Sequence, residues 1–121
     1  MSDYVQLMKI EEYKNISVCL YIEQDKVFEI GEKMNKLHEL AYMNGYNWEA
    51  FLNHYLEKNS PELLDGLESD PEAGMYAAYY DLTADNEAKA SSFILLIKKL
   101  IENESLIYDY MQENGDEIEW D

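Results

Sequence analysis

The sequence predicts an α+β fold: a single domain over residues 1–121 in which an antiparallel sheet of two β-hairpins has helices packed on one face, in the order ββααββαα. Two observations predict this class. Apolar residues alternate with polar ones in two parts of the chain, as in half-buried strands, and recur at three- and four-residue steps elsewhere, as in amphipathic helices. The 121 residues are 47% hydrophobic, which is enough to bury one core.

The first hairpin is predicted from two strands near the beginning of the chain. One strand runs from about Tyr4 to Ile10, and a turn over residues 12–15 leads to the second. The second strand has one strongly aliphatic face, because every other position carries a branched side chain: Ile16, Val18, Leu20 and Ile22.

Two helices are predicted between the hairpins. Asp25 is the expected N-cap of the first, and its apolar periodicity extends to Ala41. We expect this helix to end near Asn44-Gly45, where the turn residues lie. Asn47 is the expected N-cap of the second helix, whose apolar stripe consists of Trp48, Phe51, Leu52, Tyr55 and Leu56.

The second hairpin is predicted from the stretch ESDPEAGMYAAYYD, residues 68–81. A short strand over Leu67–Ser69 leads into a type I turn over Asp70–Ala73, with Pro71 at its second position. Gly74 follows where a left-handed backbone would resume the ladder, and the return strand covers Met75–Asp81. Its two faces carry alternate residues: Met75, Ala77 and Tyr79 on one, and Tyr76, Ala78 and Tyr80 on the other.

The last third of the chain is predicted to be helical. A wide apolar stripe marks a deeply buried helix, with Ala90, Phe93, Ile94, Ile97, Leu100 and Ile101, and Leu95 and Leu96 are expected to widen it. Ser105 is the expected N-cap of a short final helix. The acidic tail at 114–121 either docks a partner or forms a solvated, mobile end.

Charge is the dominant feature of the composition. The chain has 26 acidic residues and nine lysines, and it has no arginine. Residues 1–60 contain 10 acids and 6 lysines, a net charge of −4, whereas residues 61–121 contain 16 acids and 3 lysines, a net charge of −13. Such a field repels nucleic acid and anionic membranes and attracts basic proteins or cations. The alternative is that the charge only keeps the protein soluble, but the asymmetry between the two halves is larger than solubility requires. We therefore expect a protein partner, with neither nucleic acid nor membrane as a target.

No residue pattern predicts catalysis, a cofactor or a metal site. His38 and His54 lie in different predicted helices, and HELAY has Tyr42 where a zinc-protease motif requires its second histidine. Residues 81–92 lack the glycine and the closing glutamate of a calcium loop. Cys19 is the single cysteine and is interpreted as a small packed residue, typical of a reducing compartment. With no signal peptide and no long apolar stretch recognised, a cytoplasmic location is expected.

The segment GYNWEAFLNHYLEKNSPELLDGLESDPEAGMYAAY, residues 45–79, resembles a family of bacterial immunity proteins, the one numbered 51 in the polymorphic-toxin classification. The resemblance rests on Gly45-Tyr46 and Trp48-Glu49 at the start of a helix and on the acidic hairpin over Asp70–Met75. It implies a non-enzymatic role: binding and neutralising a cognate toxin C-terminal domain. The matched residues expected to be structural are Gly45, Trp48, Asp70, Pro71 and Gly74.

The expected docking surface lies in the acidic second half of the chain, and its toxin partner would be a basic effector such as a nuclease. Tyr76 or Tyr80, or alternatively Tyr79, would be an exposed aromatic anchor. The remaining candidates for partner binding are Glu72, Asp116, Glu117, Glu119 and Trp120. The alternative is a small acidic adaptor or regulatory domain that binds another basic protein. The oligomeric state is left open.

Overall fold

The computed structural model describes residues 4–121 and contains four strands and four α-helices in the predicted order ββααββαα. Two single-turn 3₁₀ helices, Pro61–Leu63 and Gly115–Glu117, follow the second and fourth α-helices. The elements are β1 (Val5–Ile10), β2 (Asn15–Tyr21), α1 (Asp25–Leu37), α2 (Gly45–Asn59), β3 (Glu68–Ser69), β4 (Met75–Asp81), α3 (Ala84–Glu102) and α4 (Ser105–Asn114).

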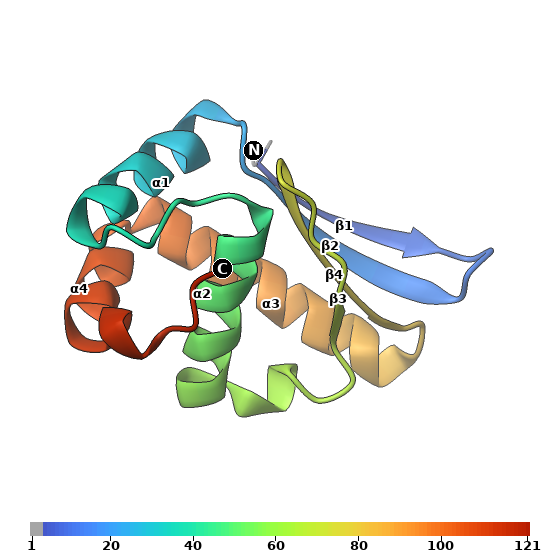
Figure 1. Ribbon diagram of the computed structural model, residues 1–121. Helices are drawn as coiled ribbons and strands as arrows, with labels where there is room; N and C mark the ends of the chain where they lie inside the picture. The colour runs from blue at the N-terminus through green and yellow to red at the C-terminus, as the bar shows by residue number, and fades with distance from the viewer. Residues whose placement is uncertain (1–3) are drawn as a thin grey trace.

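The four strands form one antiparallel sheet in the order β1-β2-β4-β3. The two hairpins therefore meet through β2 and β4, in a register that places Val18 opposite Ala78. The helices lie on one side of this sheet (Figure 1), with α2 and α3 in contact with its strands. The predicted α+β class, with one antiparallel sheet covered on one face, is confirmed.

The core lies between the sheet and the helices. The sheet face that points to the helices carries fully buried side chains from β2 and β4: Ile16, Val18, Leu20, Tyr76, Ala78 and Tyr80. The stripe predicted for α3 is buried at its six main positions, whereas Leu95, which was expected to widen it, is exposed and Leu96 is half-buried. The alternation of β4 is therefore correct, and the structure assigns the face with Tyr76 and Tyr80 to the core.

Helix α1 ends earlier than its apolar periodicity predicts. The backbone leaves the helix at His38, in an extended conformation with φ −147° and ψ 120°. Side chains satisfy the backbone groups of the turn that follows: Asn35 donates to the carbonyl oxygens of His38 and Glu39, and the amide of Leu40 donates to His38 Nδ1 at 3.2 Å. Residues 38–44 thus form a loop, although Ala41 within it is fully buried.

The predicted helix N-caps are wrong by one to three positions. Asp25 and Ser105 are the first residues inside their helices. The N-caps are the residues before them, Gln24 and Glu104. In α2 the N-cap is Asn44, whose side-chain oxygen accepts a hydrogen bond from the backbone amide of Asn47 at 2.9 Å.

The turn of the second hairpin is displaced toward its return strand. Glu72 and Met75 exchange both backbone hydrogen bonds, which makes Ala73-Gly74 a two-residue loop. The amide of Asp70 already pairs with the carbonyl of Ala77, so the Asp-Pro pair belongs to the arm of the hairpin. The prediction of a left-handed Gly74 is wrong: the positive-φ glycine in the part of the chain that the structure describes is Gly66, at φ 80°.

Candidate protein-binding surface

The outward side of α2 and the last residues of the chain enclose a groove of about 600 Å³. We call this hollow the acidic groove, because five of its ten lining residues are carboxylates and none is a lysine. It is lined by Tyr46, Glu49, Ala50, Asn53, His54, Glu57, Glu117, Glu119, Trp120 and Asp121.

One wall of the acidic groove follows from the amphipathic pattern of α2. The inward positions carry Trp48, Phe51, Leu52 and Leu56, all of them buried. Glu49, Asn53 and Glu57 recur at four-residue steps on the opposite side, so their side chains lie in one row along the helix.

The other wall is the C-terminal segment, residues 115–121, which packs along α2 (Figure 1). Ile118 is buried, and the indole N–H of Trp120 donates to the carbonyl of Gly115 at 3.0 Å. The amide of Asp121 donates to Asn47 Oδ1 at 2.6 Å, and the Asn47 amide group donates to the carbonyl of Tyr42 at 2.7 Å. The segment is therefore attached to the domain by the burial of Ile118 and by the hydrogen bonds of Trp120 and Asp121.

His54, which lines the acidic groove, contacts Tyr110 of α4. The hydroxyl of Tyr110 donates to the carbonyl oxygen of His54 at 3.1 Å, and His54 Nδ1 lies 2.5 Å from the same hydroxyl. Burial raises the pKa of Tyr110 to about 12, so its hydroxyl is neutral at physiological pH. Tyr110 therefore adds no negative charge to that of the groove carboxylates.

The carboxylates of the acidic groove have few cationic neighbours. Lys58 Nζ lies 3.4 Å from Glu117 Oε2, an exposed ion pair of the kind that stabilises proteins little. No other lysine among residues 4–121 forms an ion pair with a residue that lines the groove. The groove therefore presents a local negative field to an approaching partner.

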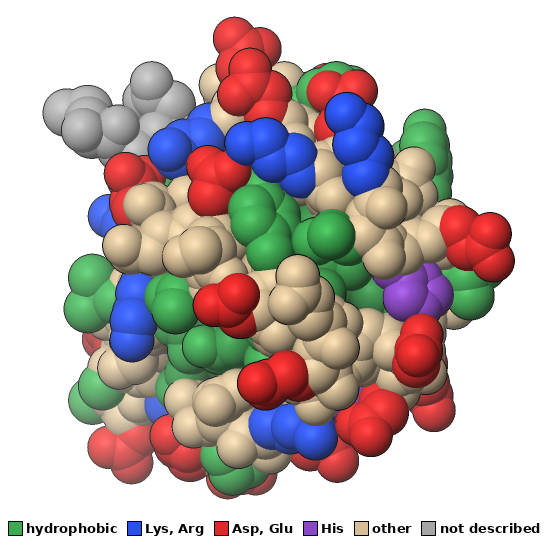
Figure 2. Space-filling view, turned by 90° about the vertical axis from the view of Figure 1, so that its left-hand side faces the viewer, with side chains coloured by type: hydrophobic (Ala, Val, Ile, Leu, Met, Phe, Trp, Pro, Cys, Tyr) green, Lys and Arg blue, Asp and Glu red, His purple; other side chains and the backbone are tan. Residues whose placement is uncertain are grey.

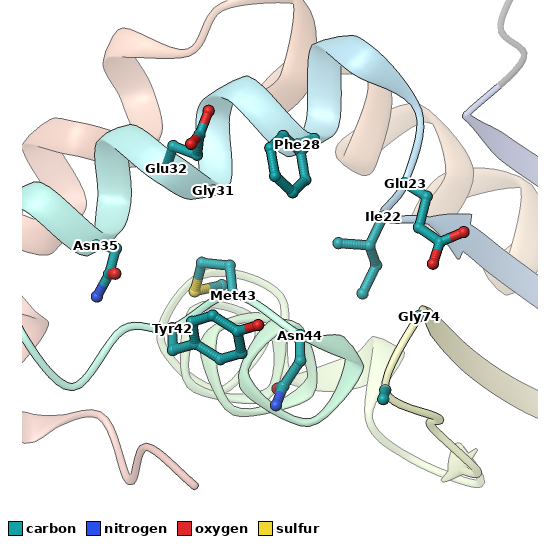
Figure 3. Close-up of a pocket in the computed structure, with 11 residues that line it drawn as sticks. Ile22, Glu23, Phe28, Gly31, Glu32, Asn35, Tyr42, Met43, Asn44 and Gly74 are labelled. Carbon is teal, nitrogen blue, oxygen red and sulfur yellow. The ribbon is translucent and has the colours of Figure 1, made fainter.

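A second hollow, of about 430 Å³, lies between α1, the loop after it and the turn of the second hairpin (Figure 3). We call it the apolar pocket. It is lined by Ile22, Glu23, Phe28, Gly31, Glu32, Asn35, Tyr42, Met43, Asn44, Ala73 and Gly74. Asn44 lines this pocket and Tyr46 lines the acidic groove, so only Gly45 separates the two hollows along the chain.

The face formed by α1 and α4 differs in its charge. Figure 2 shows this side of the molecule, where lysine and acidic side chains are intermixed around hydrophobic ones. Lys33 on α1 pairs with Glu104 at the start of α4, at 2.7 Å, so part of this charge is compensated within the protein. A basic partner is attracted less strongly here than at the acidic groove.

Comparison with known proteins identifies the family. The model of the family described as Immunity protein 51 matches residues 6–116, which is nearly the whole chain. The chain belongs to this family. Searches of curated proteins and of solved structures gave no significant match. Membership supports an immunity function directed against a toxin, and hence a toxin protein as the binding partner.

The immunity protein brings together only part of the residue set predicted for partner binding. Glu117, Glu119 and Trp120 line the acidic groove. Asp116 lies next to it, with its carboxylate 3.1 Å from His38 Nε2, and Glu72 is exposed at the tip of the second hairpin. The three remaining groove carboxylates were not predicted: Glu49, Glu57 and Asp121.

The expectation that Tyr76 or Tyr80 faces outward is wrong. Both side chains are fully buried, because the helices cover the sheet face on which they lie. The alternative, Tyr79, is on the opposite and half-exposed face, where its hydroxyl donates to Glu68 at 3.1 Å. That face lies away from the helices, so Tyr79 is not part of the acidic groove.

The two buried tyrosines predict a pair of substitutions with opposite effects. The Tyr80 hydroxyl donates to the carbonyl of Leu63 at 2.5 Å, whereas the Tyr76 hydroxyl has no hydrogen-bond partner among the described residues. We expect Tyr76→Phe to stabilise the fold by about 1 kcal/mol, because it removes an unsatisfied buried hydroxyl, and Tyr80→Phe to destabilise it by about 1 kcal/mol. Urea denaturation of the two variants checks the signs; equal shifts would contradict this difference in hydrogen bonding.

Two further searches of the described residues gave negative results. Within residues 4–121, no cluster of three or more histidine, cysteine, aspartate or glutamate side chains is arranged to hold a metal ion. Over the same residues, no helix has both the length and the apolar character needed to cross a membrane.

Proposed function

We propose that this immunity protein acts in the bacterial cytoplasm as the non-enzymatic inhibitor of one toxin C-terminal domain from a polymorphic-toxin system, and that this domain is basic, most simply a nuclease. The observation that carries the proposal is the acidic groove, where five carboxylates line one hollow without a lysine. A nuclease holds phosphates with lysine and arginine, and a negative surface is complementary to that chemistry.

The acidic groove would act mainly on the rate of association. Its carboxylates lie at an exposed rim, where charge steers the approach of a partner more than it slows dissociation. Fast capture suits an inhibitor that must reach the toxin before the toxin reaches its substrate. Both walls of the groove are formed by ordered segments, so little backbone conformational entropy is lost when the partner docks.

Point substitutions test this proposal better than removal of the C-terminal segment, which would also delete the buried Ile118 and the hydrogen bond from Asp121 to Asn47. The test variant is Glu49→Gln, Glu57→Gln and Glu119→Gln combined. Glu117 is left unchanged because Lys58 pairs with it. The control combines Glu11→Gln, Glu12→Gln and Glu29→Gln, which removes the same net charge at exposed positions outside the groove.

We expect the groove variant to bind the toxin domain encoded by the neighbouring gene about tenfold more slowly at 0.05 M salt, with a smaller change in dissociation. The control variant should change the association rate less than twofold. Raising salt to 0.5 M should slow the wild type as well, because the Debye length falls from about 14 to about 4 Å. Surface plasmon resonance at both salt concentrations measures these rates.

Three results would count against the proposal. If neither the groove variant nor salt changes the association rate by twofold, docking through the acidic groove is wrong. If hen lysozyme, a basic protein of unrelated function, binds as tightly as the toxin domain, the groove recognises charge alone and the adaptor role is favoured. If the toxin domain cleaves neither DNA nor RNA, the nuclease assignment is wrong and the inhibitory role remains.

A further inference from the structure

The side of α1 that lines the apolar pocket differs in charge from the other exposed side of the helix. The flank that faces the apolar pocket carries Phe28, Gly31, Glu32 and Asn35, at three- and four-residue steps. The other exposed flank carries the three lysines of this helix: Lys26, Lys33 and Lys36. The apolar pocket thus lies on the side of α1 that has no lysine.

The apolar pocket has apolar walls and an acidic rim. Figure 3 shows Ile22, Phe28 and Met43 directed toward the hollow from three different segments, with Glu23 and Glu32 on either side of Phe28. Phe28 is 53% exposed and Tyr42 is 70% exposed, although side chains of this size contribute most when they are buried. The volume of the apolar pocket, about 430 Å³, is in the range of pockets that enclose small ligands and is large enough for one large side chain.

We propose that the toxin domain inserts one large apolar side chain, a leucine, methionine or phenylalanine flanked by lysine or arginine, into the apolar pocket. This inference rests on the proposed function and names the second contact of the same interface. Charge complementarity identifies the occupant: the lining contains two glutamates and no lysine, so an apolar residue with basic neighbours matches both the walls and the rim.

In the proposed interface, the acidic groove and the apolar pocket affect different rate constants of toxin binding. Asn44 and Tyr46, on either side of Gly45, place the apolar pocket and the acidic groove next to each other along the chain, with exposed Tyr42 and Tyr46 at the junction. Carboxylates at the groove govern how fast the toxin domain arrives. The apolar contact governs how slowly it leaves, because buried anchors act mainly on dissociation.

The test uses two variants that remove apolar contact and one that fills the pocket. Phe28→Ala and Tyr42→Ala truncate exposed side chains, so the fold should tolerate both. Ala73→Trp adds a large side chain at an exposed position that lines the pocket. The matched controls are Leu95→Ala on α3, at 65% exposure, and Tyr13→Ala in the β1–β2 turn, at 69% exposure; both lie outside the two hollows.

We expect each of the three pocket variants to raise the dissociation rate of the toxin domain at least tenfold, and to do so equally at 0.05 and 0.5 M salt. The controls should change it less than twofold. Circular dichroism of each free variant verifies that it is folded. The groove variant supplies the contrast, because its effect should fall on association and should disappear at high salt.

The outcomes separate this inference from the proposed function. If the wild type binds and the groove variant slows association, while all three pocket variants behave as the controls do, the apolar pocket is not part of the interface and the proposed function stands. The inference is also wrong if the pocket variants abolish a dimer of the free protein and leave toxin binding unchanged, since a second copy is then the occupant. If the wild type does not bind the toxin domain, the proposed function and this inference both fail.

Discussion

Gly45→Ala is expected to destabilise the immunity protein by about 3 kcal/mol or more, the upper range for inserting a group into a packed site. A β-carbon at this position would lie 1.7 Å from the carbonyl oxygen of Glu72 and 2.4 Å from that of Met75. Both obstacles are backbone atoms, so no rotamer change relieves the clash. The start of α2 would have to separate from the second hairpin, and the bond from the Gly45 amide to the Ala73 carbonyl would be lost. Urea denaturation measures the change.

Two other glycines serve as controls for this substitution. Gly66→Ala meets no atom within 4 Å and should cost about 1 kcal/mol, because of its positive φ alone. Gly74→Ala brings a β-carbon 3.1 Å from a carboxylate oxygen of Glu23, a flexible side chain that can move, and should cost less still. A Gly45→Ala variant no less stable than these two would show that α2 and the hairpin are not in the described contact.

Trp48→Ala is expected to destabilise the protein by about 3–5 kcal/mol, the usual cost of removing a large buried aromatic side chain. Trp48 is 1% exposed and lies in the core cluster between α2 and the sheet. Its ring meets that of Phe51 edge to face, with centroids 6.0 Å apart, so the substitution also removes an aromatic contact. The measurement is the free energy of unfolding in urea; a change below about 1 kcal/mol would place Trp48 outside the core.

Trp48→Phe is the informative companion variant. The indole N–H of Trp48 is buried and has no hydrogen-bond partner among residues 4–121. Phenylalanine removes this unsatisfied donor and keeps much of the apolar volume, so the two effects oppose each other. We expect Trp48→Phe to cost less than half as much as Trp48→Ala. Equal costs would indicate that the indole ring contributes through a contact specific to tryptophan.

The order of elements was predictable because strands and helices differ in their apolar period. That signal was reliable for the centre of the α3 stripe, from Ala90 to Ile101 at helical spacing, although Leu95, which was predicted to widen it, is 65% exposed. It was misleading at the end of α1, because Ala41 is buried from a loop and not from a helix. Apolar periodicity indicates which residues are buried. It identifies a helix only where no side chain replaces the helical hydrogen-bond partners of the backbone N–H and C=O groups. Here the side chains of Asn35 and His38 supply such partners.

The orientation of β4 required the three-dimensional structure. Alternation established that Tyr76 and Tyr80 share one face, and both faces carry an alanine between larger side chains. Nothing in that pattern distinguishes the face that α2 and α3 cover. The buried hydroxyl of Tyr80 is accommodated by the carbonyl of Leu63, a partner 17 residues away. The partner of the Tyr80 hydroxyl therefore comes from a distant segment that local sequence does not reveal, and Tyr76 is buried without such a partner in the described part of the chain.

The candidate surface was predictable only in its parts. The acidic C-terminal segment was evident from charge, and the outward row on α2 follows from helical spacing. The C-terminal segment and the outward row of α2 form one groove because distant parts of the chain are joined there. One such link is the hydrogen bond from Asp121 to Asn47, which are 74 residues apart in the chain. The apolar pocket depends likewise on α1 ending at Leu37, so that the following loop can form its opposite wall.

The separation of core residues from groove residues on α2 has a consequence for how the sequence of this protein can change during evolution. Core residues such as Trp48 and Leu52 alternate with groove residues such as Glu49 and Asn53, and the two sets share no side chain. Glu49 and Asn53 are half-buried, and substitutions at surface positions away from the core usually change stability by no more than about 0.5 kcal/mol. If the acidic groove binds the toxin as proposed, a lineage can exchange the outward row of α2 to follow a changing toxin while the core residues stay the same. New specificities would then arise through single, independently tolerated steps, without a compensating mutation in the interior.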